Sequence, residues 1–182
     1  TQIKSSNQQI KSEILKNWSL GEGMSVGASI VQQHVRLGEE AAKERLDWFI
    51  TNKVMHYSSS RDIPSLDGTS GLSENLSLGE ISPIECWNAG VQALEAGHDD
   101  AKIFLKELVW REFAYHLAYH TPRILDQNWR QEWDSFPWNT KENDEKVLLW
   151  KQGRTGVPFV DAAMRELYVT GRMHNRGRMI VA

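Results

Sequence analysis

The sequence predicts an all-α protein with long ordered loops. Apolar residues recur at helical spacing in several stretches, and residues that start or end helices flank these stretches. No stretch shows the alternation of polar and apolar residues that is typical of a strand. The chain has 182 residues, of which 40% are hydrophobic, and this suits one domain or a part of one.

The first helix with a clear apolar stripe is predicted over residues 39–54. Residues 1–35 before it are polar and contain several glycines, so we expect an interdomain linker there, with a short helix near residues 10–18. Residues 36–182 are expected to be the N-terminal part of a helical domain that is truncated at Ala182. The stripe of the first helix consists of Ala41, Ala42, Leu46, Phe49 and Ile50.

The next helix is predicted to begin after Ser82 and to run to about Glu95. Ser82 is a suitable N-cap, Pro83 suits the first turn, and Glu85 lies three residues after the cap, as in a capping box. Before this helix, residues 57–68 are expected to form a loop. Residues 69–79 are small and polar, with three apolar anchors, Leu72, Leu76 and Leu78.

The rest of the chain is predicted to contain one long helix, two shorter ones and the start of another. These cover residues 99–119, 147–151, 160–170 and 173–182. Pro158 opens the third of them and Gly171 ends it. Residues 121–146 are expected to be rich in loops. The core stripe of the long helix is expected to be Ile103, Phe104, Leu108, Phe113 and Leu117.

The charges of the chain are unevenly distributed. The net charge is −3, but residues 151–182 carry six Lys and Arg against two acidic residues, so this segment is +4 and the rest is −7. The asymmetry fits a local anion-binding face, and a solvated, charged helix end is the alternative.

The cysteine count and the hydropathy of the chain indicate in which cellular compartment the protein is expected. Cys86 is the only cysteine, which excludes a disulfide within the chain and a cysteine-based zinc site and fits a reducing, cytoplasmic setting. No apolar run approaches the roughly 20 residues of a membrane helix, so no membrane partner is expected. The chain starts at Thr1 without Met, so we expect the natural N-terminus to be missing.

Three segments carry residues that suit a large polar ligand. Residues 69–73 combine three hydroxyls with a glycine, which can cradle phosphate or form an ordinary capping loop. Glu107, Trp110 and Arg111 lie three and four residues apart, so they share a helix face and suit a planar, negatively charged ligand. An ion pair beside a core Trp is the alternative. The third segment places amide, guanidinium and thioether groups close together at Asn175, Arg176, Arg178 and Met179.

Two other features are weaker. His116 and His120 have the spacing of a zinc helix, but the intervening Glu and a third ligand are missing, so we expect polar surface residues and no metal. Trp138 suits either surface packing or electron transfer.

Together, these segments resemble the photolyase/cryptochrome family, specifically its helical FAD-binding domain. The match covers about residues 37–182 and is collinear. Its motifs are RDIP at 61–64, DGTSGLS at 67–73, GEISP at 79–83, ELVWREF at 107–113, WxxGxTGxP at 150–158, VDAAMREL at 160–167 and MHNRxRM at 173–179.

The resemblance implies a role for each candidate residue. FAD would be contacted by Tyr57, Thr69, Ser70, Gly71, Leu72, Ser73, Arg111 and Arg178. The pocket for a flipped pyrimidine dimer would be lined by Glu107, Trp110, Asn175 and Met179, with Trp110 stacking on the dimer. DNA would be bound by Arg61 and Arg176 at its phosphates, together with Glu107, Trp110, Arg111 and Asn175. Trp138 would be the surface member of a tryptophan chain that carries electrons to the flavin.

The implied activity is light-driven repair of cyclobutane pyrimidine dimers in double-stranded DNA by electron transfer from reduced FAD, in a monomeric lyase of bacterial type. A cryptochrome-type photoreceptor without repair activity is the alternative, and Glu107, Trp110 and Met179 favour repair over it. A helical interaction domain without a cofactor is a third hypothesis.

Some positions depart from the family pattern. Gly71 stands where relatives often carry a basic residue, and Arg172 stands where an aromatic residue is common. The antenna domain of the family is expected to be absent, so its chromophore is not identified, and this chain alone is expected to be inactive.

Overall fold

The computed structural model describes residues 12–20, 23, 27–141 and 144–181. Its α-helices are α1 (Ala28–Val31), α2 (Glu39–Asn52), α3 (Tyr57–Ser60), α4 (Ser73–Leu78), α5 (Pro83–Glu95), α6 (Ala101–His120), α7 (Glu145–Lys151), α8 (Pro158–Thr170) and α9 (Asn175–Val181). Short 3₁₀ helices are η1 (Leu15–Trp18), η3 (Val54–His56), η4 (Pro122–Leu125) and η5 (Gln131–Ser135). The described part of the chain contains no strand, so the all-α prediction is confirmed.

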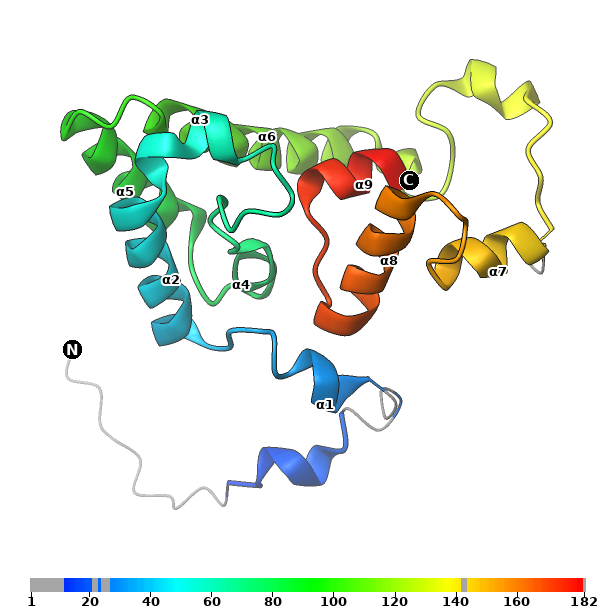
Figure 1. Ribbon diagram of the computed structural model, residues 1–182, viewed down its shortest axis with the longest axis horizontal. Helices are drawn as coiled ribbons and strands as arrows, with labels where there is room; N and C mark the ends of the chain where they lie inside the picture. Colours follow the sequence, from blue (N-terminus) through cyan, green and yellow to red (C-terminus); the bar gives the residue numbers. More distant parts are fainter. Residues whose placement is uncertain (1–11, 21–22, 24–26, 142–143, 182) are drawn as a thin grey trace, which may run out of the picture.

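The main core lies where α2, α5 and α6 pack together (Figure 1). At its centre the Phe49 ring is fully buried, with the ring centroids of Phe104 and Tyr57 at 5.0 and 5.5 Å. Aromatic rings at such distances and inclined angles contribute beyond simple burial. The stripe predicted for residues 39–54 therefore faces the core at Ala42, Leu46 and Phe49.

A second, smaller cluster joins α7, α8 and α9. Ala163, Met164 and Met173 are its buried residues. Gly177 allows α9 to approach closely, because a Cβ there would lie 3.0 Å from Met173 Cγ and 3.3 Å from the Ala163 Cβ. The Trp150 indole donates a hydrogen bond to the Val181 carbonyl at 2.9 Å and so ties α7 to the end of α9.

Sequence signals at helix ends were reliable. The capping box at Ser82 and Glu85 is present, with both reciprocal hydrogen bonds formed. Gly171 ends α8 with φ of 72°, a left-handed conformation that suits glycine. The start of a further helix predicted at residues 173–182 corresponds to α9.

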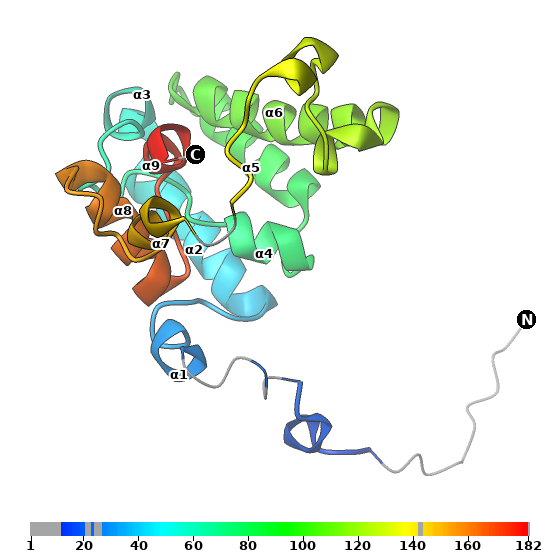
Figure 2. The same cartoon turned by 90° about the vertical axis from the view of Figure 1, so that its right-hand side faces the viewer.

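Three expectations of local structure were wrong. Residues 57–68 are not entirely a loop, since they begin with α3. Leu78 does not anchor its segment, because 71% of it is exposed. Phe113 is not on the buried side of α6 and is 49% exposed, because nine residues separate it from Phe104 and place it on the opposite side of the helix. The second half of α6 also extends past the packed core (Figure 2). All buried residues of α6 lie in its first half.

The segment before α2 is partly helical. η1 falls within the predicted short helix, whose first residue, Ile10, lies outside the described residues. α1 contacts α8, and Val31 Cγ1 would lie only 3.1 Å from a Cβ at Gly171. Residues 27–31 therefore pack against the end of α8.

Candidate functional site

A cavity of about 630 Å³ gathers residues that are far apart in the sequence. It is lined from the segment before α4, from α3, from one side of α6 and from the start of α9. The predicted site residues among its lining are Tyr57, Arg61, Thr69, Ser70, Gly71, Leu72, Ser73, Glu107, Arg111, Asn175 and Arg178.

Residues 69–73, called the hydroxyl loop below, are held in place by Arg45. This side chain is buried on α2, and it donates to the Ser70 carbonyl at 2.7 Å and to the Thr69 carbonyl at 2.9 Å. It also forms a bidentate pair with Asp67 at 2.6 and 3.0 Å, and this hydrogen bonding lowers the pKa of Asp67. Because both loop carbonyls bind Arg45, the backbone of the hydroxyl loop is fixed from behind.

Gly71 allows the hydroxyl loop to lie against the Arg45 guanidinium. Its φ is 64°, and a Cβ there would lie 3.3 Å from Arg45 Nη2. A side chain at this position would therefore strain the backbone and press on the supporting arginine.

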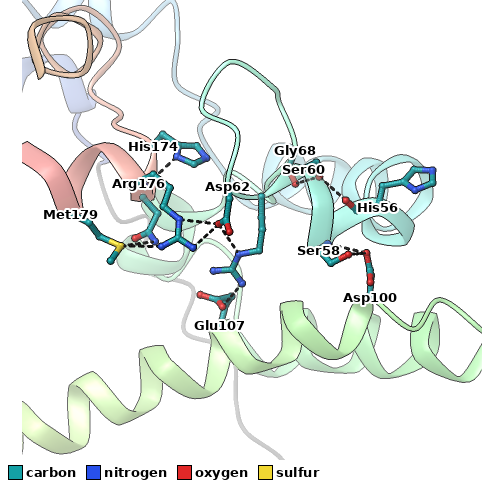
Figure 3. A network of polar contacts seen from close by, with 12 residues as sticks. His56, Ser58, Ser60, Asp62, Gly68, Asp100, Glu107, His174, Arg176 and Met179 are labelled. Carbon is teal, nitrogen blue, oxygen red and sulfur yellow. Dashed lines mark hydrogen bonds and ion pairs between the residues drawn. The ribbon is translucent and has the colours of Figure 1, made fainter. Parts of the chain in front are cut away.

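A network of ion pairs joins the loop after α3 to α6 and α9 (Figure 3). Arg61 pairs with Glu107 on α6, and this hydrogen bond raises the pKa of Arg61. Asp62 accepts from Arg176 Nε at 2.9 Å and lies 3.4 Å from Arg61 Nε. The hydrogen bond from Arg176 is the main cause of a lowered pKa at Asp62. The two arginines predicted to bind DNA phosphates are thus both paired with carboxylates.

Tyr57 lies deep in the site. Its side chain is buried at the edge of the Phe49 and Phe104 rings, and the Arg61 guanidinium carbon lies 5.3 Å from the centre of its ring. Burial raises the pKa of Tyr57 to about 12, so it is a neutral phenol at neutral pH.

Four predicted site residues lie outside the lining of the cavity, namely Trp110, Trp138, Arg176 and Met179. Trp110 is 65% exposed and meets Phe113 edge to face at 5.8 Å. Met179 is 64% exposed, with its sulfur 3.3 Å from Arg176 Nη1. Trp138 is also exposed, and lines a separate cavity of about 670 Å³ with residues 124–128. The structure therefore divides the predicted site residues into those that line the cavity and those that lie outside it.

Four residues to which the sequence gave no role in the site have a clear place in it. Arg45 and Asp62 act through the contacts above, while Arg172 and His174 line the cavity. Of these four residues, only Arg45 could have been found from the hydrophobic periodicity of the sequence. It lies three residues after Ala42 and four before Phe49, on the buried side of α2. Asp62, Arg172 and His174 depend on contacts between distant segments.

His116 and His120 lie on the exposed second half of α6, with ring centroids 4.4 Å apart. The described residues bring no cluster of three or more His, Cys, Asp or Glu into metal-binding proximity. Among the helices that the structure describes, none has both the length and the apolar character needed to cross a membrane.

Residues 104–182 match the family described as the FAD binding domain of DNA photolyase. The matched segment comprises most of α6 and all of α7, α8 and α9. The predicted resemblance to photolyases and cryptochromes is thereby confirmed.

Relatives of the photolyase family match nearly the whole chain. It is 43% identical over 174 residues to the deoxyribodipyrimidine photo-lyase of Agrobacterium fabrum, covering 94% of this chain and 36% of that protein. It is 40% identical over 154 residues to the Escherichia coli protein of the same name, covering 82% and 32%. The chain therefore spans about a third of the length of the curated relatives it matches.

Solved structures of photolyase relatives share the fold. A bacterial class III photolyase from Agrobacterium tumefaciens superposes with a TM-score of 0.88 at 40% identity, covering 98% of this chain and 37% of that one. A cryptochrome from Synechocystis sp. superposes with a TM-score of 0.71 at 31% identity, covering 82% and 32%.

Proposed function

We propose that the whole protein is a light-driven DNA photolyase that binds FAD and repairs cyclobutane pyrimidine dimers. The observation that carries this proposal is the cavity itself, since it gathers the hydroxyl loop, Glu107 and the start of α9 in one place. These are the segments that would serve the cofactor and the lesion in a photolyase. Similarity to photolyases over almost the entire chain supports the same conclusion.

The residues that line the cavity fit a dinucleotide with phosphate groups. Hydroxyls and backbone amides of residues 69–73 are suitable phosphate donors. Five arginines and four carboxylates line the cavity, so positive charge is in slight excess. Arg172 Nε and His174 Nε2 are buried without hydrogen-bond partners among the described residues, and buried polar atoms of this kind usually have a partner. A ligand with several acceptor oxygens would supply one.

The cofactor roles then follow from position. We assign FAD contacts to Tyr57, Thr69, Ser70, Gly71, Leu72, Ser73, Arg111 and Arg178. Arg178 has no ion pair within the described part of the chain, so its guanidinium is free to meet the cofactor. Its Nε donates to the Met173 carbonyl at 3.1 Å, which orients the side chain. When bound in its reduced form, FAD supplies the electron that splits the dimer under light, so the protein needs no nucleophile or general base of its own.

The lesion would be bound at the rim of the cavity. Glu107 accepts hydrogen bonds and Asn175 both donates and accepts them, so the two suit the polar edges of pyrimidines. Trp110 is exposed beside Glu107 on α6 and offers a flat face for stacking, and Met179 supplies a soft apolar contact. An exposed Trp110 agrees with this role, because a flipped dimer arrives from solvent.

DNA phosphates would meet Arg61 and Arg176. These contacts would orient the duplex without reading its sequence, and each would make binding more sensitive to salt. Trp138, whose indole is 53% exposed and lies 4.6 Å from the Phe136 ring centre, suits an electron entry point at the surface.

The test uses the whole protein loaded with FAD and a duplex oligonucleotide that contains one thymine dimer. We expect blue light to remove the dimer, with little loss in the dark, as measured by chromatography of the digested DNA. Trp110→Ala should weaken dimer binding by about 1–3 kcal/mol, which is the scale of one base–aromatic stack. Trp133→Ala, at another exposed tryptophan, is the matched control and should leave the affinity unchanged.

The same experiment separates repair from the cryptochrome alternative, which the similarity to the Synechocystis cryptochrome keeps open. If the protein binds FAD and responds to light but leaves the dimers intact, the photoreceptor hypothesis replaces repair. Failure to bind FAD would reject both.

A further inference from the structure

Arg172 is placed at the cavity by the end of α8. Gly171 turns the chain in a left-handed conformation, and the Arg172 amide donates to Thr170 Oγ1 at 3.1 Å. The side chain then lines the cavity together with the hydroxyl loop. No motif of the sequence pointed to this contact, since the two segments lie about a hundred residues apart.

The side chain of Arg172 is partly buried, and two of its guanidinium nitrogens make no hydrogen bond among the described residues. Its Nη2 pairs with the Glu74 carboxylate on α4, in an ion pair without hydrogen-bond geometry. Its Nε is buried and has no hydrogen-bond partner among the described residues. A guanidinium has five N–H donors in a planar fork, so one carboxylate does not satisfy it.

The surroundings of Arg172 are rich in positive charge. Burial lowers the pKa of Arg172, and the charges of Arg36 and Arg45 lower it further, while Asp67 opposes them. Arg45 is already occupied by Asp67 and by two carbonyls of the hydroxyl loop. Arg172, unlike Arg45, therefore has a guanidinium donor that no described residue satisfies.

A purely structural tie between α4 and α8 is the simpler explanation of the pair with Glu74. Such a tie does not account for the buried Nε without a hydrogen-bond partner on a side chain that lines the cavity, because an unsatisfied buried donor costs about 1–3 kcal/mol. An oxyanion in the cavity would satisfy this donor, and arginine binds phosphate oxygens with favourable geometry. Glu74 can remain paired at the same time, because the fork has donors on several sides.

We propose that Arg172 binds the pyrophosphate of FAD, acting with the hydroxyl loop as the cationic part of the phosphate site. This inference rests on the proposed function, in that it takes FAD as the ligand of the cavity. It adds a residue of this chain to the cofactor site and defines which part of the cofactor that residue recognises.

The experiment compares FAD with riboflavin, which carries the same ring system without phosphates, in the whole protein. Binding of each ligand is measured by quenching of flavin fluorescence. We expect Arg172→Gln to weaken FAD binding roughly tenfold to hundredfold, the range for a charged hydrogen bond. Riboflavin binding should not change, and Arg172→Lys should restore part of the FAD affinity because it retains the charge.

Glu74→Gln is the matched variant, because it removes the ion pair and keeps Arg172. A phosphate-binding Arg172 predicts FAD affinity that is unchanged or higher in this variant. A structural tie predicts that Glu74→Gln and Arg172→Gln weaken FAD and riboflavin alike, and this result would overturn the proposal. If Arg172→Gln does not fold, Arg172→Lys and Glu74→Gln still separate the two explanations.

Failure of the unaltered protein to bind FAD would overturn the proposed function and this assignment with it. Normal FAD binding that Arg172→Gln leaves unchanged would overturn the assignment alone.

Discussion

The region from α2 to α6 and the region from α7 to α9 are held together by different forces. Around Phe49, the first region buries a continuous apolar cluster that draws on several helices and on η3. The second buries only Ala163, Met164 and Met173, with Trp150, Val160 and Val181 partly buried around them. Its remaining order comes from polar contacts.

Asp161 is the main polar contact of the second region. Its carboxylate accepts from the Thr155 amide and hydroxyl, both at 2.7 Å, and from the Gly156 amide at 3.0 Å. Arg165 Nε donates to the Gly153 carbonyl at 2.9 Å and fixes the other end of the same turn. The turn before α8 is therefore positioned by hydrogen bonds to α8 itself.

Residues of both regions line the cavity. The first region is stabilised by apolar burial and the second mainly by hydrogen bonds, and this difference bears on function. Tyr57, Glu107 and the hydroxyl loop belong to the apolar body. Asn175 and Arg178 belong to the smaller region, whose geometry depends on hydrogen bonds and one close helix contact. Substitutions in the first region should therefore act on overall stability, and those in the second on the shape of the cavity.

The largest effect is expected from Phe49→Ala. Removing a fully buried aromatic ring from the first region should lower the free energy of unfolding by about 3–5 kcal/mol, through lost burial and the cavity left behind. Urea denaturation of the whole protein measures this. Phe136→Ala, at a ring that is 48% exposed, is the control and should cost far less. If both substitutions lowered the free energy of unfolding equally, the cluster around Phe49 would not be the main source of stability.

Arg45→Met should have the next largest effect. It leaves the Thr69 and Ser70 carbonyls and Asp67 without their donor, so we expect a loss of about 1.5–3 kcal/mol of stability, the scale of hydrogen bonds to a charged group. FAD affinity should fall as well, because the hydroxyl loop loses its support. Lys43→Met, on the exposed side of the same helix, should change neither quantity. An unchanged FAD affinity in Arg45→Met would show that FAD binding does not depend on the support that Arg45 gives to the hydroxyl loop.

Gly177→Leu tests the close contact in the second region. The added side chain should separate α9 from α8 at a cost of about 1–3 kcal/mol, the usual range for overpacking. FAD binding is expected to fall more than stability suggests, since Asn175 and Arg178 move with α9. Val169→Leu adds apolar volume at an exposed site of α8 and is the control. Loss of stability without loss of FAD binding would contradict the link between α9 and the cavity.

The smallest effect, and the one with a pH signature, is expected from Asp161→Asn. Hydrogen bonding, first of all from the Thr155 hydroxyl, lowers the pKa of Asp161 in the folded state. A lowered pKa contributes stability above the unfolded value of about 3.9, and this contribution is lost as pH falls through the folded value. The difference in unfolding midpoint between the unaltered protein and Asp161→Asn should thus be constant near neutral pH and shrink below about pH 4. Asp47→Asn, at an exposed position of α2, is the control, and a difference that grows at low pH would refute this role of Asp161.

Much of the fold could be predicted because its signals are local. The capping box at Ser82, the left-handed Gly171 and the stripe of α2 each depend on residues within a turn or two. The hydroxyl loop was predicted to contact FAD, and Glu107 and Asn175 to line the lesion pocket, only through the resemblance to photolyases and cryptochromes. The roles assigned to these residues remain predictions.

The errors have two physical causes. Phe113 lies nine residues after Phe104, so at 100° per residue it is on the opposite side of α6 from this buried ring. Leu117, further along, is only partly buried, because all buried residues of α6 lie in its first half. Leu78 likewise has the character of an anchor but points to solvent at the end of α4. Periodicity therefore shows which side of a helix is apolar, while the neighbouring helices determine how far along it that side is buried.

The sequence by itself determined most of the helices and their ends, and from it come the predicted contacts to a cofactor and DNA. Only the tertiary structure decided that Arg45 supports the hydroxyl loop, that Asp62 joins Arg61 to Arg176, and that Arg172 reaches the same cavity from α8. Helix propensity and capping act between near neighbours, so one segment can display them alone. Ion pairs and unpartnered donors arise between segments that meet only when the chain folds.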